Sequence, residues 1–201
     1  MKPYPHKRFS FAFMFLLAAV FCLSFPHPAL AAPSDVVISQ VFGGGGNSQA
    51  PYKNDFVELF NRSTTAVTLD GWSLQYASAT GTGNFSANPI VTLSGSLQPG
   101  QYYLIQLAGG ANGTALPAPD KIGAINMAAG AGKIALVHTT TGLTCNGGST
   151  PCQPSQLTQL VDLVGWGNAN FYEGGPAPAT SNTLALFRNN NGCQDSDNNT
   201  I

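Results

Sequence analysis

Carboxylates are the main side chains of this chain that could perform acid–base or metal chemistry. Those that could form a hydrolytic site are Asp55, Glu58, Asp162 and Glu173. A metal ion held by carboxylates can activate a water molecule, and a further carboxylate can act as a general base. A metal-dependent hydrolase is therefore one hypothesis for this sequence.

Glu58 has the most unusual setting, because it is in phase with Phe56 and Phe60 along a predicted strand. Successive residues of a strand alternate between its two faces, so this carboxylate and both aromatic rings share one face. An ionised carboxylate among aromatic rings needs a partner or contact with water. The cations available for an ion pair are Arg62, Arg188 and Lys133. We favour such a structural carboxylate, or a sheet face left partly exposed, over a catalytic acid.

Nucleophilic catalysis and phosphate binding find no support in the sequence. His138 is the one histidine beyond residue 31, and no serine stands in a nucleophile-elbow motif. Gly43–Gly46 lacks the lysine that a phosphate-binding loop requires, and Gly132 with Lys133 is followed by Ile134 in place of Ser or Thr. Both glycine segments are interpreted as turns. We predict no catalytic residue, no cofactor and a protein that is not an enzyme.

The C-terminal segment alternates oxygen-bearing side chains at Asp195, Asp197 and Asn199, much as the start of a calcium loop does. A calcium loop also needs a distal carboxylate that binds through both oxygens, and none follows in the sequence. We therefore favour a polar turn or a frayed terminus over a metal site.

The segment from residue 166 to residue 173 combines aromatic, amide and carboxylate side chains in a region expected to be a long loop. The candidate binding residues are Trp166, Asn168, Phe171, Tyr172 and Glu173. Exposed aromatic rings beside amides can grip sugars or peptides, which makes this loop the candidate binding site. The alternative is that the loop folds its rings back as a plug over an open end of the fold.

The N-terminal residues predict export. Lys2, Lys7 and Arg8 precede an uncharged run from Phe9 to Phe25, and the small-residue stretch Ala29–Ala31 is typical of a cleavage site. The apolar run is interrupted before it reaches the roughly 20 residues that a membrane-spanning helix needs. We predict a signal peptide at residues 1–31, a mature chain at residues 32–201, and no transmembrane anchor after cleavage. The protein is expected to be secreted, either extracellular or periplasmic.

The mature chain of about 170 residues is long enough for one domain with a sizeable core. After cleavage, five cations stand against nine carboxylates, a net charge of −4. No basic stripe is present, so direct binding to nucleic acid is disfavoured. The expected partner is an unidentified extracellular or cell-surface ligand, either a protein or a glycan.

Three cysteines remain in the mature chain, in a compartment where disulfides persist. We favour a bond between Cys145 and Cys152, because the short Gly- and Pro-containing excursion between them can bring them together. Two other single pairings are possible, and Cys193 is then free or seeks a partner outside the chain.

Short β-runs separated by turn residues predict an all-β sandwich of about nine strands. The predicted strands are Val36–Phe42, Asp55–Phe60, Ala66–Leu69, Trp72–Ala77, Ile90–Leu93, Tyr102–Leu107, Lys133–His138, Leu160–Val164 and Thr183–Phe187. Trp72 and Leu74 share one strand face, and Val57 and Leu59 share another, so we expect these four residues in the core. Replacing Trp72 by Ala is expected to cost about 3 to 5 kcal/mol.

Three blocks of residues, in order along the mature chain, resemble a known family. The first contains Val36–Phe42, Asp55–Leu59, Asn61, Val67, Leu69–Trp72 and Leu74. The second contains Leu97, Pro99, Gly100, Tyr102 and Leu104. The third contains Val161, Asp162, Val164, Gly165, Gly167, Glu173, Gly174, Ser181, Asn182, Thr183 and Arg188. The pattern is similar to that of the lamin-tail domain family, in the form found in bacterial exported proteins.

The resemblance implies an immunoglobulin-like β-sandwich and a frequent association with extracellular nucleases, phosphoesterases or other hydrolases. It implies no activity, because no catalytic residues belong to the family as such. Members of this kind usually continue with a short strand and a Pro-rich end, so a truncated C-terminus at Ile201 is expected. The resulting hypothesis is a secreted, non-catalytic binding or structural module. The alternatives are an accessory-domain fragment of an extracellular nuclease or phosphoesterase, and the metal-dependent hydrolase.

Overall fold

The computed structural model describes residues 35–200. The predicted signal peptide and the first residues of the predicted mature chain lie outside the described residues. The strands are β1 (Val36–Phe42), β2 (Asn54–Asn61), β3 (Val67–Thr68), β4 (Ser73–Ser78), β5 (Val91–Thr92), β6 (Ser96–Leu97), β7 (Tyr102–Gly109), β8 (Lys121–Ile122), β9 (Gly132–Val137), β10 (Leu160–Trp166) and β11 (Leu186–Phe187). Two short helical turns complete the described elements, η1 (Phe85–Ala87) and α1 (Pro154–Leu157).

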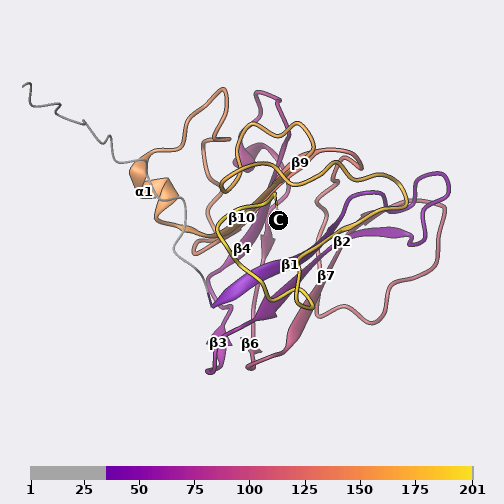
Figure 1. The fold of residues 1–201 in the computed structure, drawn as a ribbon, viewed down its shortest axis with the longest axis horizontal. Helices are drawn as coiled ribbons and strands as arrows, with labels where there is room; N and C mark the ends of the chain where they lie inside the picture. Colours follow the sequence, from indigo (N-terminus) through magenta and orange to yellow (C-terminus); the bar gives the residue numbers. More distant parts are fainter. Residues whose placement is uncertain (1–34, 201) are drawn as a thin grey trace, which may run out of the picture.

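Two packed sheets form the body of the molecule (Figure 1). The first has five strands in the order β11-β1-β2-β7-β8, and the second has four in the order β10-β9-β4-β5. All pairings within them are antiparallel except β7 with β8. The all-β sandwich predicted from the sequence is therefore present.

The nine predicted strand positions are all occupied, but several strands differ in length. β1 has the predicted bounds, whereas the last predicted strand, residues 183–187, is reduced to β11. Two strands were not predicted, β6 and β8, and each has only two residues. So short a strand shows no period of alternation, and its pairing depends on its neighbours.

The main core lies between the two sheets. Val57 and Leu59 of β2 face Leu74 of β4 across it, and all three side chains are inaccessible to solvent. Trp72 differs from the expectation, because it is only partly buried at the edge of this core and contacts the ring of His138, with ring centroids 4.3 Å apart. The fully buried indole is that of Trp166 at the end of β10.

The outer surface of the four-stranded sheet is covered by a second, smaller core. Ala135 and Val137 of β9 pack there against Phe85 of η1 and against the loop that contains Cys145. Lys133 lies on the same side, and its Nζ donates hydrogen bonds to Asn146 O at 2.7 Å and Asn170 Oδ1 at 2.8 Å. Burial lowers the pKa of Lys133 to about 8.

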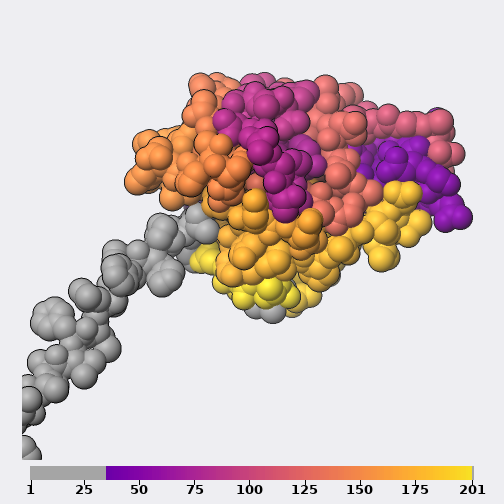
Figure 2. Space-filling model, turned by 90° about the horizontal axis from the view of Figure 1, so that it is seen from above, coloured from indigo at the N-terminus to yellow at the C-terminus, as the bar shows by residue number. Residues whose placement is uncertain are grey.

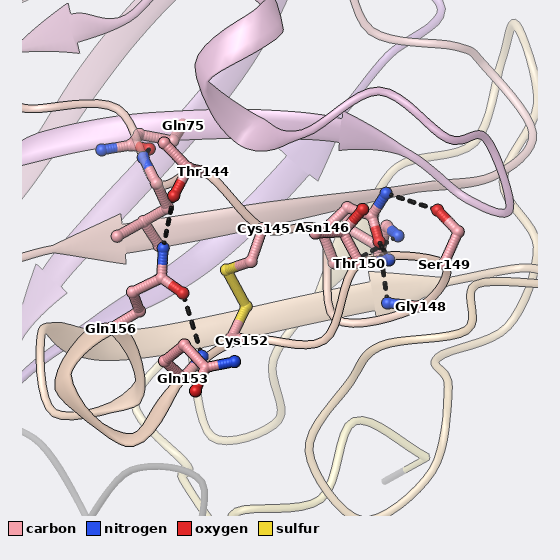
Figure 3. Close-up of a disulfide and its surroundings, with 12 residues drawn as sticks. Gln75, Thr144, Cys145, Asn146, Gly148, Ser149, Thr150, Cys152, Gln153 and Gln156 are labelled. Atoms are coloured by element: carbon pink, nitrogen blue, oxygen red, sulfur yellow. Dashed lines mark hydrogen bonds between the residues drawn. A yellow bond between two sulfur atoms is a disulfide. The ribbon is translucent and has the colours of Figure 1, made fainter.

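A disulfide joins Cys145 to Cys152 and closes the loop over this second core (Figure 3). Within the loop, Asn146 accepts hydrogen bonds from the N–H groups of Gly148 and Thr150, which holds the turn. This is the pairing that we favoured from the sequence, and Cys193 is free. None of the helices in residues 35–200 has the length and apolar character required to cross a membrane.

Candidate functional site

The predicted binding loop is largely folded into the protein. Trp166 is inaccessible to solvent and packs near Tyr76, with ring centroids 6.3 Å apart. Gly132 lies against this indole so closely that an added Cβ would be 2.5 Å from a ring carbon. Phe171 is half-buried and meets Phe85 edge-on in the second core. The rings of Trp166 and Phe171 thus belong to two different cores and form no common ligand surface.

Glu173 also differs from the expectation of an exposed binding residue, since only 2% of it is accessible. Its Oε1 accepts a hydrogen bond from Leu163 N at 3.3 Å. Asn168 is exposed and Tyr172 is half-exposed, so they are the members of the predicted set that contact solvent most clearly. The arrangement corresponds to the plug that we considered as the alternative to a binding loop.

The C-terminal segment closes the edge of the four-stranded sheet at β10. Asn199 Oδ1 accepts hydrogen bonds from Gly165 N and Glu173 N, and its Nδ2 donates to Leu163 O. One amide side chain thereby replaces part of a missing neighbouring strand. Asn199 is buried, contrary to the expectation of a frayed terminus, and its Nδ2 also donates to Glu173 Oε2 at 3.4 Å. Figure 1 shows the yellow C-terminal residues beside β10, and Figure 2 shows them at the molecular surface.

The corresponding edge of β1 is closed by Asp162 and Arg188. Asp162 Oδ2 accepts a hydrogen bond from Ile38 N at 2.6 Å, and Arg188 Nε donates to Ile38 O at 2.8 Å. Arg188 also binds both carboxylate oxygens of Asp162, at 2.7 and 2.9 Å. Asp195 joins this pair to Arg62, because its Oδ1 lies 3.3 Å from Arg188 Nη1 and its Oδ2 lies 3.2 Å from Arg62 Nη1. These groups complete backbone hydrogen bonds that would otherwise be lost in the interior.

Three carboxylates converge beside this network. Oxygen atoms of Glu173, Asp195 and Asp197 lie within 4.8 Å of one another. Burial, and secondly the charge of Asp162, raise the pKa of Glu173 to about 9, so Glu173 is protonated near neutral pH. Arg62 and Arg188 offset part of the remaining charge. The grouping differs from the calcium set considered from the sequence, because Glu173 replaces Asn199.

The other two carboxylates of the hydrolase hypothesis have local partners. Asp55 accepts hydrogen bonds from Gly45 N and Met127 N, both at 2.9 Å, and burial raises its pKa to about 6. Glu58 accepts hydrogen bonds from the side chains of Ser39 at 2.7 Å and Gln40 at 3.2 Å. Of the two alternatives given for Glu58, the ion pair with Arg62, Arg188 or Lys133 is wrong, whereas Glu58 does lie half-exposed on a sheet face. The two arginines bind aspartates, and Lys133 belongs to the other sheet.

The outer side of the five-stranded sheet, which we call the open face, carries a different kind of surface. Strand alternation places outward those residues that lie next to core residues such as Val57 and Ile105. The residues of the open face are Val37, Gln40, Phe42, Phe56, Glu58, Phe60, Tyr102, Leu104, Gln106, Ile122 and Phe187. Three of them, Val37, Phe42 and Phe56, are buried. Tyr52 lies over one end, edge-on to Phe42 and Phe56.

The open face holds most of the exposed large hydrophobic side chains of residues 35–200. Ile122 is 65% exposed, Phe187 is 55% exposed and Tyr102 is 40% exposed, and Tyr52 at the rim is 37% exposed. The remaining exposed large hydrophobic residue of residues 35–200 is Leu184, which lies outside this face. The outward side of the other sheet, by contrast, is covered by the second core. Clustered exposed apolar groups mark interaction sites more often than scattered ones do.

A groove of about 550 Å³ adjoins the open face at β11. Its apolar lining includes Ile38 and Val41 of β1, Val164 of β10, and Leu184 beside β11. Phe187 contributes to both the groove and the open face. The groove therefore runs from the edge of the sandwich to the exposed aromatic surface.

A family model described as Lamin Tail Domain matches residues 29–192. The chain belongs to the lamin-tail domain family. This family has an immunoglobulin-like fold and is non-enzymatic, and the two-sheet sandwich agrees with that fold. No curated protein matches this lamin-tail domain.

Sequence reasoning missed the open face of this lamin-tail domain for a specific reason. Phe56, Glu58 and Phe60 were recognised as sharing one side of a strand, but the partners of that strand were not assigned. Only the register, in which Phe60 pairs with Tyr102 and Glu58 pairs with Leu104, turns a single-strand pattern into a surface. The alternation in β7 would have been the signal, since its even-numbered residues are the outward ones.

Proposed function

We propose that this lamin-tail domain acts outside the cell as a non-catalytic binding module, and that the open face holds its ligand. The observation that carries this proposal is the concentration of exposed aromatic and aliphatic side chains on one side of the sandwich. Leaving such groups in water costs free energy that a bound ligand would recover. A surface of this kind is consistent with a cell-surface or extracellular partner, either a glycan or a protein.

Export is part of the proposal and has its own support. The first 31 residues have the composition of a signal peptide, and a disulfide stabilises the second core. Mass spectrometry of the protein recovered from the culture medium or the periplasm should give a chain that begins near Ala32. Recovery of the intact chain, with Met1, from the cytoplasm would contradict export.

The binding role is tested with a variant that removes the exposed apolar groups but leaves the core intact. We expect the fluorescently labelled mature protein to bind saturably to intact cells of the species that makes it. The triple substitution Tyr102→Ala, Ile122→Ala and Phe187→Ala should reduce this binding at least tenfold. Its thermal unfolding should stay close to that of the original protein, because these side chains are exposed and the one hydrogen bond lost, from the Tyr102 hydroxyl to Asn191 O, lies at the surface.

Leu184→Ala is the matched control, because Leu184 is as exposed as Phe187 and lies outside the open face. It should bind as the original protein does. A loss with Leu184→Ala equal to that of the triple variant would assign the site to the groove. Absence of saturable binding by the original protein would overturn the proposed function.

A further inference from the structure

The centre of the open face carries the polar residues Gln40 and Glu58 beside Leu104, whereas its two ends are aromatic. At one end Phe60 and Tyr102 pack together, with ring centroids 4.7 Å apart. At the other end Tyr52 meets Phe56, with ring centroids 5.8 Å apart. Phe56 and Phe60 are four residues apart on β2, so the two ends are separated by about 13 Å. This distance fits a short chain of sugar rings better than a single ring.

Hydrogen-bonding groups lie at the centre of the open face and at its Phe56 end. Gln40 is paired with Glu58 across β1 and β2, and Gln106 is paired with Phe56 across β2 and β7. Glu58 Oε1 is bound by Ser39 and Gln40, which orients the carboxylate. Among the described residues, neither Glu58 Oε2 nor the side-chain amide of Gln106 has a hydrogen-bond partner. These groups are therefore free to bind a ligand that carries hydroxyl groups.

The charge of the open face disfavours polyanionic ligands. Glu58 is the one ionisable carboxylate among the residues that define it, and no Lys or Arg is among them. Nucleic acids and acidic polysaccharides would meet repulsion without the cations that normally bind them. A neutral ligand avoids this cost.

The polar centre also argues against a protein partner. The buried centre of a protein interface is normally depleted of charged residues, and covering Glu58 Oε2 with apolar side chains would leave it without a partner. A sugar chain can cover the aromatic rings and also supply a donor to Glu58 Oε2, because its ring faces are apolar and its hydroxyl groups donate to carboxylates and amides. Aromatic rings beside such polar groups are well suited to a ligand that is apolar on one side and polar on the other.

We propose that the open face binds a neutral oligosaccharide, packed on the Phe60–Tyr102 pair and on Tyr52, and hydrogen-bonded to Glu58 between these rings and to Gln106 beside Phe56. This inference rests on the proposed binding function and names its ligand class. Phe187 and Ile122 flank the chain on the β11 and β8 sides.

The first test uses defined carbohydrate probes. Calorimetric titration of the mature protein with hexasaccharides of β-linked glucose, xylose and N-acetylglucosamine, and of α-linked glucose, should detect binding to at least one of them. Polygalacturonate serves as the polyanionic probe and should not bind. Tyr102→Ala and Gln106→Leu should each weaken the binding at least tenfold, and Leu184→Ala should leave it unchanged.

Gln106→Leu separates a sugar ligand from a protein ligand. The substitution removes hydrogen bonds needed by a sugar but adds apolar surface that a protein partner would tolerate. Binding to a probe that is unaffected by both Tyr102→Ala and Gln106→Leu would overturn the open face as the glycan site. Folding of each variant is checked by its thermal unfolding.

Treatment of intact cells distinguishes failure of this inference from failure of the proposed function. Periodate cleaves the vicinal diols of sugars, so it should abolish the binding of labelled protein, whereas protease treatment of the cells should not. Loss of binding after protease but not after periodate, with no affinity for the probes, would overturn the glycan inference and leave the binding function standing. No binding to untreated cells or to any probe would overturn both.

Discussion

At the scale of single residues, burial changes what the acidic side chains of this domain can do. Glu173 is almost completely inaccessible, and its pKa is raised to about 9 by burial and by the nearby charge of Asp162. One guanidinium nitrogen of Arg188, Nη2, donates to both carboxylate oxygens of Asp162. Both carboxylates also accept backbone hydrogen bonds from strands. Their main contribution is therefore to the stability of the fold.

The pKa of Glu173 predicts how stability depends on pH. Because the folded-state pKa of about 9 lies above the ordinary value of 4.5, the folded protein holds a proton that the unfolded chain releases between these values. This contribution to the free energy of unfolding is fully present below about pH 4.5 and is lost as the pH rises through about 9. Glu173→Gln keeps the side chain neutral, so its Tm should exceed that of the original protein at pH 9 and approach it at pH 5. Each 1 kcal/mol recovered corresponds to roughly 2 to 4 °C.

The comparison is made by thermal unfolding at pH 5, 7 and 9. Glu58→Gln is the control, because Glu58 is half-exposed on the open face and lies away from this network. A difference between Glu173→Gln and the original protein that is the same at all three pH values would contradict the prediction.

The two tryptophans should differ in their effect on stability. Trp166→Ala removes a fully buried indole from the centre of the sandwich and should lower the free energy of unfolding by about 3 to 5 kcal/mol. Trp72→Ala removes a partly buried ring and should cost roughly half as much. Urea unfolding of both variants measures the difference. An equal or larger loss of unfolding free energy for Trp72→Ala would contradict this prediction and would make the tryptophan at the edge of the core the more stabilising of the two.

At the scale of elements, β1 and β10 show how a sandwich can close its edges without adding full strands. β11 pairs with β1 over only two residue pairs. The remaining backbone groups on these edges are met by side chains of Asp162, Arg188 and Asn199. Covered edges cannot recruit strands from other chains, which lowers the tendency to aggregate.

Asn199→Ala tests this description of the β10 edge. The substitution leaves Gly165 N and Glu173 N without an acceptor and Leu163 O without one of its donors. We expect a loss of roughly 2 to 4 kcal/mol, because buried polar groups without partners are costly. Hydrogen exchange should accelerate at the amides of Gly165 and Glu173.

Asn198→Ala provides the neighbouring control. Within residues 35–200, the hydrogen bonds to Asn198 Oδ1 come from Thr200 alone, so the loss of Asn198 should have a small effect on stability and none on exchange at β10. Similar losses of stability for the two variants would mean that the C-terminal segment stabilises the fold through general packing and not through the Asn199 hydrogen bonds.

At the scale of the whole molecule, the two outward surfaces of the sandwich are unequal. The four-stranded sheet is covered by a disulfide-closed loop and by η1, whereas the five-stranded sheet leaves aromatic and aliphatic side chains exposed. Among residues 35–200, the outward side of the five-stranded sheet is therefore the one that keeps several large apolar groups in contact with solvent. The proposed binding function and the glycan inference both depend on this asymmetry.

The charge of the whole domain predicts an absence of DNA binding. Residues 35–200 carry five cations and nine carboxylates, and Lys133 and Arg188 are engaged in the interior. A fluorescently labelled DNA duplex at 50 mM salt should show no anisotropy change even at protein concentrations near the ~10⁻⁴ M limit of typical non-specific binding. Binding that weakens steeply with added salt would contradict this prediction and would favour a nucleic-acid role.

The local sequence pattern was sufficient to predict several strands, the disulfide and the family of this protein. Alternating apolar residues located β1, β2, β4 and β7, and the short Gly- and Pro-containing excursion indicated the bond between Cys145 and Cys152. The order of three residue blocks indicated the family that the comparison then established. These features depend on neighbouring residues or on their order along the chain, so they can be read directly from it.

Burial and pairing between distant segments were decided only by the tertiary structure. Arg188 reaches Ile38 across a separation of 150 residues, and Asn199 reaches Leu163 across 36. Such contacts turned an expected frayed end into the cover of a sheet edge and placed Trp166 in the core. The open face likewise exists only once β1, β2, β7, β8 and β11 are in register. The physical reason is that the environment of a side chain is set by what packs against it, and those partners come from elsewhere in the chain.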